Sequence, residues 1–410
     1  MTVAITEFCK NGSSISHVLE ATMSCKSESG PIGQCASDHS RATLYVSLEL
    51  SPSKWLVTSL VSGTDKLSKH LVPGGDCGAL LQLLAALKAK AEKQSGMAVV
   101  VATIQEAGLD GFSLHRLLEA NGAESWIVDP SSVAAPRRAR RAKSDAIDGE
   151  TLLRTLLAYR RGEPRVCSMV HPTSPHDEDR RRLTRERRTL MRERIEHTNR
   201  IKGLLMSQGI SGYDPLRKNC LVRLDELTTR DGHRLPPRLR AEIGREIDRL
   251  ELLARQLKQV EAERDALISQ VADVADSPAA QLMRLKGIGV ETATLLWLEG
   301  LFRTFANRRQ LAAYAGLAPT PWLSGRIRRE QGISKSGNPR LRTGMIELAW
   351  LWLRNQPGSA LSRWFADRVR AEGGRKRRIT IVALARKLLI ALWKYVNRGE
   401  VPEGAALKSV

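Results

Sequence analysis

The sequence is poor in aromatic residues and contains no long uncharged apolar run. Aromatic side chains make up 4% of the 410 residues. The longest apolar stretch, at 379–393, is interrupted by Arg386 and Lys387. It is therefore too short and too charged to cross a bilayer as a helix. Because no secretory apolar segment follows Met1 either, the sequence predicts a cytoplasmic protein without a membrane partner.

Cysteine is also scarce, and its spacing fits neither a disulfide framework nor a zinc site. No two cysteines form a CxxC pair, and none has a histidine at the spacing of zinc ligands. We expect reduced thiols, which are typical of a cytoplasmic protein. The cysteines are Cys9, Cys25, Cys35, Cys77, Cys167 and Cys220.

Acidic residues are outnumbered by basic ones, 44 Asp and Glu against 65 Lys and Arg, which gives a formal net charge of +21. This surplus favours a polyanionic partner. Basic residues extend from Arg137 to Arg378 rather than forming one amphipathic helix, so nucleic acid is a better partner than an anionic membrane surface. The length of 410 residues is enough for two or three folded domains. Hydrophobic residues make up 42% of the chain, so a sizeable core can form.

Regular apolar patterns begin near residue 41, after a Ser-, Gly- and Cys-rich stretch at 1–40 that we expect to be a flexible tail. The order of the predicted elements, three strands, helix, strand, helix, strand, helix, is that of a ribonuclease H-like α/β domain, which we assign to 41–165. The patterns predict strands at 44–50, 55–61, 70–72, 97–103 and 126–128, and helices at 77–93, 111–121 and 143–159.

Two long helical segments follow within 166–278. The stretch 180–212 is highly charged and nearly free of proline, and 239–274 carries apolar residues at spacings of three and four. This spacing predicts a coiled coil, formed within one chain or between chains. We expect a mainly helical C-terminal domain at 279–400, with a polar loop between Pro319 and Pro339, and a short tail at 401–410.

Four carboxylates mark the strand and helix ends of the predicted ribonuclease H-like domain. Glu49 ends the first strand, Glu106 follows the buried strand, and Asp145 and Asp148 begin the last helix. In such a sheet these positions meet at one edge. Carboxylate oxygens are the ligands that Mg²⁺ and Mn²⁺ prefer, and two such ions can promote phosphodiester cleavage. The alternative is that Asp145 and Asp148 only complement the dipole of their helix.

Residues predicted to contact nucleic acid gather in three segments. The first is a basic track before Asp145, and its alternative interpretation is a solvated charge run. The second is a Gly-Ile-Gly turn of the helix-hairpin-helix type, whose glycines let the backbone approach a phosphate, or which is only a tight turn. The third surrounds Ser324. The residues are Arg137, Arg138, Arg140, Arg141, Lys143, Lys286, Gly287, Gly289, Arg326, Lys335, Arg340 and Arg342.

Ser324 stands beside Gly325 in this arginine-rich segment, so it can be a nucleophile towards a phosphodiester that guanidinium groups hold. No histidine lies in the predicted C-terminal domain, and any base that activates the serine must come from elsewhere. The alternative is a loop that binds phosphate without covalent chemistry.

Two parts of the chain resemble the DEDD-type transposases of bacterial insertion sequences, the group of bridge-RNA-guided recombinases. The segments 106–111, 128–130 and 140–148 are similar to the RuvC-like domain of that family. The segments 285–293, 310–319, 324–325 and 332–338 are similar to its C-terminal transposase domain. Together the two parts extend the resemblance from about Leu44 to Tyr395.

The resemblance implies catalytic and metal-binding roles for an acidic tetrad. Glu106, Asp145 and Asp148 occupy its last three places, and Glu49 stands where the family usually has Asp. It also implies that Ser324 is the catalytic serine. Ser334 is the alternative, because the match of Ser324 depends on the following glycine and on the distance to Gly332.

The activity implied by the resemblance is that of a transposase, a site-specific recombinase that cuts and rejoins DNA. It further implies Mg²⁺ or Mn²⁺, a noncoding guide RNA that pairs with target and donor DNA, and a homo-oligomer, dimer or tetramer, whose active sites combine domains of different subunits. Two alternatives remain. One is a RuvC-like metal-dependent nuclease for branched DNA, and the other is a nucleic-acid-binding derivative impaired by Glu49.

Overall fold

The computed structural model describes residues 41–108, 112–133, 145–272, 277–325, 327–371 and 376–408. At residues 145, 146, 271, 272, 327, 328 and 330 it describes the backbone alone. The chain divides into two compact units, with the boundary between Pro172 and Thr173. The expected N-terminal tail at 1–40 and the basic track at 137–143 lie outside the described residues.

The first unit is built on a five-stranded sheet with the order β3-β2-β1-β4-β5. Strands β1, β2 and β3 run antiparallel to one another, and β4 and β5 run parallel to β1. This order and these directions fit the predicted ribonuclease H-like fold. The strands are β1 (Arg41–Leu50), β2 (Lys54–Val61), β3 (Ser68–Pro73), β4 (Ala98–Glu106) and β5 (Glu124–Val128).

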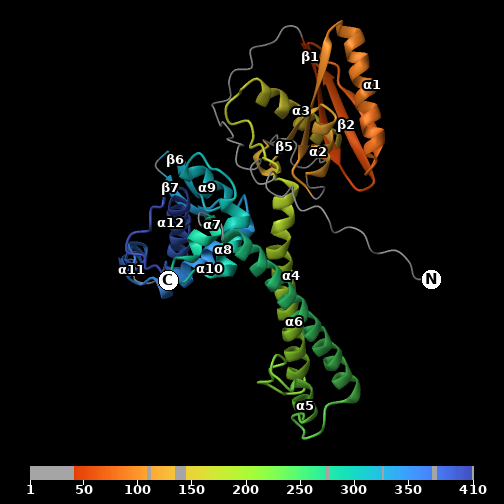
Figure 1. Ribbon diagram of the computed structural model, residues 1–410. Helices are drawn as coiled ribbons and strands as arrows, with labels where there is room; N and C mark the ends of the chain where they lie inside the picture. Colours follow the sequence, from red (N-terminus) through yellow and green to blue (C-terminus); the bar gives the residue numbers. More distant parts are fainter. Residues whose placement is uncertain are drawn as a thin grey trace, which may run out of the picture. The chain divides into compact units, whose positions relative to one another are not determined.

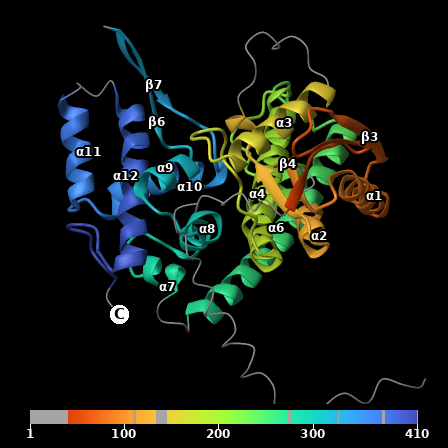
Figure 2. The ribbon, with the colours of Figure 1, turned by 90° about the horizontal axis from the view of Figure 1, so that it is seen from above.

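Helices cover both faces of this sheet (Figure 2). On one face Leu44 and Leu48 pack with Leu80 of α1 (Cys77–Ser95), and α2 (Ser113–Ala120) joins the same core. On the other face Ala102 and Ile104 of β4 pack with Leu152 and Leu156 of α3 (Asp145–Arg160). Because side chains alternate along a strand, odd-numbered positions of β1 and even-numbered positions of β4 point towards α3.

Two long helices, α4 (Pro175–Met206) and α6 (Pro237–Ala272), lie side by side at the start of the second unit (Figure 1). The short helix α5 (Cys220–Asp225) lies between them in the chain. Leu190 of α4 packs with Leu253 of α6, so the apolar seam expected for a coiled coil is buried within one chain.

The rest of the second unit is mainly helical and shares one large apolar core. Leu285, Leu311, Trp352 and Leu389, which are distant in the sequence, all belong to this core. Its elements are α7 (Pro278–Met283), α8 (Val290–Leu296), the single π turn η3 (Trp297–Leu301), α9 (Arg308–Tyr314), α10 (Pro339–Asn355), α11 (Ala360–Ala371) and α12 (Arg377–Arg398).

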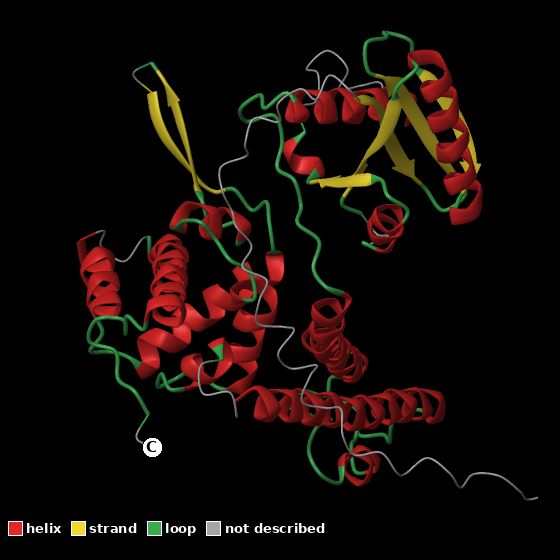
Figure 3. Ribbon diagram, turned by 45° about the horizontal axis from the view of Figure 1, so that its top comes forward, coloured by secondary structure: helices red, strands yellow, loops and turns green. Residues whose placement is uncertain are grey.

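The expected polar loop between Pro319 and Pro339 is instead a two-stranded antiparallel ribbon. It consists of β6 (Pro319–Ser324) and β7 (Ile327–Ile333), and it extends away from the helices of this unit (Figure 3). Leu323 and Trp322 near the tip are exposed, and of the described ribbon side chains only Ile333 at the base packs against the large core, so backbone pairing holds the outer part of the ribbon. The sequence of the ribbon has no alternating apolar pattern, and for that reason the sequence prediction of a loop was wrong.

The C-terminal residues 401–408, expected to be a tail, pack against the helical core. Gln356 donates hydrogen bonds to the carbonyl oxygens of Lys286 and Ala406, each at 2.8 Å. The amide of Ala406 donates to Gln356 Oε1 at 2.7 Å, and that of Lys408 donates to the carbonyl of Arg284. This segment is too short for periodicity to indicate its packing.

Two further expectations concern membranes and cysteines. No helix among the described residues is long and apolar enough to span a bilayer. Cys77, Cys167 and Cys220 are free thiols, as expected. Cys9, Cys25 and Cys35 lie outside the described residues.

Candidate functional site

Two of the predicted carboxylates lie at the ends of adjacent parallel strands. Leu48 of β1 is paired with Gln105 of β4, and Glu49 and Glu106 are the next residues along these strands. Both occupy positions that point towards α3. Glu49 is half-buried and Glu106 is exposed. Glu106 is the last residue of β4 and not, as predicted, a residue beyond the strand.

The beginning of α3 is fixed against this face of the sheet by a close contact at Gly149. The hydroxyl of Ser47 donates a hydrogen bond to the carbonyl of Gly149 at 2.6 Å. A Cβ at Gly149 would lie 2.8 Å from Thr58 Oγ1, so only glycine allows this approach. Asp148 is half-buried beside this contact, in the same helix turn as Asp145.

The donor set of this acidic cluster, Glu49, Glu106, Asp145 and Asp148, suits a hard divalent cation, because it consists of carboxylate oxygens alone. Three of its members have described side chains. Among the side chains that the structure describes, no group of three or more Asp, Glu, His or Cys is close enough to hold a metal ion. The side chain of Asp145 lies outside that description.

Two nearby carboxylates outside the predicted set have other partners. Glu150, next to Gly149, accepts a hydrogen bond at 2.6 Å from Lys69 of β3, which lowers the pKa of this carboxyl. Asp129 follows β5 and accepts hydrogen bonds from the amide and the hydroxyl of Ser131, so it caps a short turn. These contacts distinguish both residues from the acidic cluster.

The candidate nucleophile Ser324 lies at the tip of the β6–β7 ribbon. It is exposed, it pairs with Ile327, and the next residue, Gly325, has a φ of +56°. The turn therefore requires a residue that tolerates the left-handed region, which explains the Ser-Gly pair. Arg326 lies outside the described residues. An exposed hydroxyl at a ribbon tip is accessible to a phosphodiester.

The alternative serine, Ser334, has a different environment at the base of the ribbon. It is half-buried, and its amide donates to the carbonyl of Ala318 at 2.9 Å. The neighbouring Lys335 has a φ of +59°, and its carbonyl accepts a hydrogen bond from Arg342 at 2.7 Å. In this structure Arg342 therefore fixes the loop, and the exposed Lys335 side chain remains a candidate phosphate contact.

The Gly-Ile-Gly turn lies between α7 and α8, and its two glycines differ. Gly287 has a φ of +89°, and a Cβ there would lie 2.6 Å from Cβ of Asn355, so this glycine allows close packing against α10. Gly289 caps α8 and has open space around it, and Lys286 is exposed. Both predicted roles, a tight turn and a phosphate approach, are compatible with this arrangement.

One buried polar cluster in the second unit has no counterpart among the sequence predictions. Glu299 in the π turn is 1% exposed, and its carboxylate accepts hydrogen bonds from Arg185 at 3.2 Å and Asn338 at 2.9 Å. Asn338 also caps α10 through the amides of Arg340 and Leu341. The three partners are far apart in the sequence, so no local pattern could have revealed them. An isolated glutamate within an apolar run was the one available signal.

Comparison with known families gives two matches along the chain. The model of the transposase IS116/IS110/IS902 family matches residues 279–363. A model of DEDD-type IS110 transposases, described as a transposase, matches residues 72–208. The first match contains Ser324, and the second contains Glu106, Asp145 and Asp148.

Several curated proteins are similar over much of their length. The chain is 58% identical to "Putative transposase y4rJ" of Sinorhizobium fredii over 375 residues, which is 89% of this chain and 95% of that protein. It is 27% identical to the transposase for insertion sequence element IS1328 of Yersinia enterocolitica, over 63% of this chain and 73% of that protein. A transposase for element IS1111A of Coxiella burnetii is 26% identical, over 56% of this chain and 62% of that protein.

Proposed function

Because this chain belongs to the IS116/IS110/IS902 family of insertion-sequence transposases, we propose that it cuts and rejoins DNA with a metal-binding acidic cluster and a serine nucleophile. The observation that carries this proposal is the alignment of Glu49 and Glu106 on adjacent parallel strands, facing the helix that begins with Asp145. The substrates are the ends of the mobile element and its target.

We assign metal binding to the acidic cluster, Glu49, Glu106, Asp145 and Asp148. The donor oxygens favour Mg²⁺, with Mn²⁺ as a substitute. Divalent metal, when bound, stabilises the charge that develops on the phosphodiester and its leaving oxygen. The close contact of Gly149 with Thr58 fixes the helix turn that carries Asp148, so the sheet and the helix supply their carboxylates from rigid elements.

Ser324 is the residue that we assign to covalent chemistry. Its Oγ attacks phosphorus, the new Oγ–P bond forms, and the bond from phosphorus to the leaving strand oxygen breaks. The hydroxyl proton passes to a base, and that base is not a histidine of the C-terminal part, because the sequence has no histidine after His233. The exposed ribbon tip supports Ser324 over the half-buried Ser334.

The same proposal includes a noncoding RNA as guide and a homo-oligomer as the active form. The formal charge of +21 supports a nucleic-acid partner larger than one short duplex. Predicted contacts to nucleic acid are the basic track before Asp145, the turn at 286–289, Lys335, Arg340 and the ribbon with Arg326. Recognition of target and donor DNA would then depend on base pairing with the guide RNA. The protein would mainly contact the sugar-phosphate backbones of the nucleic acids.

The deciding experiment measures excision of a cognate element in cells, together with covalent trapping. We expect E106Q, D148N and S324A each to abolish excision, and S334A to retain it. On cleaved DNA the denatured wild-type protein should carry a covalent adduct that S324A lacks. Cleavage that needs the carboxylates but leaves no adduct would instead indicate a RuvC-like nuclease. Full activity of D148N and S324A would refute the proposal.

A further inference from the structure

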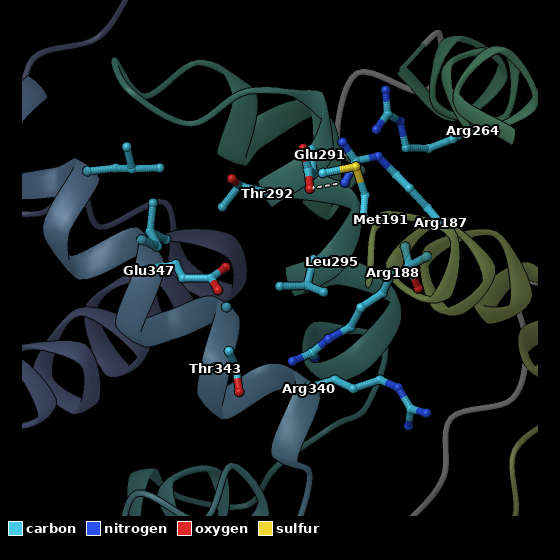
Figure 4. Close-up of a pocket in the computed structure, with 14 residues that line it drawn as sticks. Arg187, Arg188, Met191, Arg264, Glu291, Thr292, Leu295, Arg340, Thr343 and Glu347 are labelled. Carbon is cyan, nitrogen blue, oxygen red and sulfur yellow. Dashed lines mark hydrogen bonds and ion pairs between the residues drawn. The ribbon is translucent and has the colours of Figure 1, made fainter. Parts of the chain in front are cut away.

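A cavity of about 350 Å³ lies within the second unit, between α4, α6, α8 and α10 (Figure 4). Its wall combines guanidinium groups with apolar side chains. Arg187 and Arg188 come from α4 and Arg340 comes from α10, while Met191 and Leu295 contribute apolar surface. A cavity of this size falls in the range of small-molecule sites, which are mostly apolar with a few directed polar groups.

The arginines of the cavity differ in how far they are already satisfied. Arg187 and Arg264 are already paired: Arg187 Nε donates to Glu261 at 2.7 Å and its Nη1 pairs with Glu291, and Arg264 pairs with Asp265. Arg188 and Arg340, by contrast, make no side-chain hydrogen bond or ion pair within the described part of the chain. In Figure 4 Arg188 extends from α4 and Arg340 from α10, and both side chains lie in the lower part of the view. Two open guanidinium groups are well suited to a phosphate group.

The apolar part of the wall is closely packed. At Gly344 of α10, a Cβ would lie 2.0 Å from Cδ2 of Leu295, so Leu295 occupies the space beside this glycine. Met191 adds a polarisable thioether beside them. Glu347 and Thr343 also line the cavity and offer acceptors to the edge of a planar base.

We propose that this cavity receives one unpaired nucleotide of a nucleic-acid strand, whose phosphate binds Arg188 and Arg340 and whose base packs against Met191 and Leu295. The proposal rests on the proposed action on nucleic acid. A free inorganic anion would need no apolar wall, and a base within a duplex could not enter. Extrusion of a base is cheapest where the strand is already unpaired.

The test uses the full chain in EDTA, so that binding is measured without cleavage. Probes are a fluorescent single-stranded DNA, the RNA of the same sequence, and the corresponding DNA duplex. R188A should weaken single-strand binding about ten-fold, as expected for loss of a charged hydrogen bond. T292F, which fills the cavity without changing its charge, should weaken it similarly. Both variants should bind duplex like the wild type.

The matched control is R182A, which removes the same charge from an exposed position of the same helix. Its effect should be far smaller than that of R188A. If R188A loses affinity for a single strand, the result supports the cavity site. Loss for the DNA probe alone, for the RNA probe alone, or for both then shows which kind of strand the cavity binds. Equal losses in R182A and R188A, with no effect of T292F, would overturn it, because general charge would then explain the binding.

A second measurement needs no variant and so does not depend on folding. Single strands that contain 5-iodouracil are irradiated on the wild-type protein, and the adduct is mapped by mass spectrometry. We expect an adduct at Met191; adducts found only elsewhere would contradict the proposal. A protein that binds through this cavity but fails to excise DNA would refute the proposed function alone.

Discussion

The buried carboxylate of Glu299 accepts a hydrogen bond from the side-chain amide of Asn338, 2.9 Å away. Asn338 follows the Ser-Lys-Ser-Gly segment at the base of the ribbon, and its oxygen caps α10. Arg185 of α4 contacts the same carboxylate. One buried group therefore joins the long helix pair, the π turn and the end of the ribbon loop.

Asn338→Ala should destabilise the second unit by about 2 kcal/mol or more. The cap contributes roughly 1 kcal/mol, and a buried carboxylate that loses a partner costs about as much again or more. Asn338→Ser is the matched control, because serine can still cap the helix but is too short to replace the amide. Chemical denaturation measures both variants. Wild-type stability of the serine variant would mean that the contact with Glu299 contributes nothing.

Gly149→Ala should displace the start of α3 and reduce cleavage while leaving the fold intact. The added Cβ would lie 2.8 Å from Thr58 Oγ1, so the helix turn that carries Asp148 must shift. Such displacements at a catalytic group can cost about 10²-fold in rate. The assay is cleavage of element ends with purified protein.

Two further variants test why Gly149→Ala should reduce cleavage. Gly244→Ala, in α6 with open space around it, should leave cleavage unchanged and raise stability by roughly 0.5–1 kcal/mol. Adding Thr58→Ala to Gly149→Ala removes the nearest atom and should restore part of the activity. No recovery would show that the steric contact is not the reason.

Glu246 makes the stability of the α4–α6 pair dependent on pH. It is 4% exposed and accepts hydrogen bonds from Arg200 and Arg249, at 3.0 and 2.6 Å, and contacts His197. Burial alone would raise its pKa, but the hydrogen bonds of His197 and Arg200 outweigh burial and lower the pKa below the ordinary 4.5. Its stabilisation is therefore present above about pH 4.5 and is lost as the pH falls through the lowered value.

Glu246→Gln should accordingly cost about 2 kcal/mol at neutral pH, the contribution expected of hydrogen bonds to a charged group. It should also flatten the dependence of stability on pH below 4.5. Glu251→Gln, at an exposed position of the same helix, serves as control and should change neither quantity. Thermal unfolding across acidic pH measures both, and parallel curves for wild type and Glu246→Gln would contradict the role of this carboxylate.

Glu49→Gln should abolish cleavage, whereas Glu49→Asp should retain it. Mutation of a residue that only hydrogen-bonds to a metal ligand reduces metal affinity or activity by about 10–100-fold. Loss of a ligand itself should therefore reduce activity by at least about 100-fold. Glu150→Gln, whose carboxylate pairs with Lys69, is the neighbouring control and should remain active. An inactive wild type that Glu49→Asp activates would identify an impaired derivative instead.

Binding to nucleic acid should depend steeply on salt. Even 6–10 phosphate contacts reduce affinity by about 10³–10⁵ between 50 and 200 mM salt. The formal charge of +21 allows at least that many contacts. Titration of a labelled DNA at several salt concentrations checks this, and constant affinity over the range would contradict an electrostatic interface.

The sequence by itself determined the elements of the sheet and the long helices. The strand around Leu44 alternates apolar and more polar residues, and the apolar seam of α6 recurs at spacings of three and four, so both have a period that can be counted. The strand around Ile104 is buried on both faces, and its near-continuous apolar run indicates that burial. Family-specific segments likewise identified Glu106, Asp145, Asp148 and Ser324 as candidates, because their neighbours are recognisable without a structure.

Tertiary structure alone decided what depends on contacts between distant segments. The outer part of the ribbon, which carries Ser324, is held by backbone pairing, which leaves no apolar period in the sequence. The partners of Glu299, the contact of Gly149 with Thr58 and the cavity between four helices join residues that are far apart in the chain. Local patterns report which face of a segment is buried, but the identity of the group that it meets is fixed only when the chain folds.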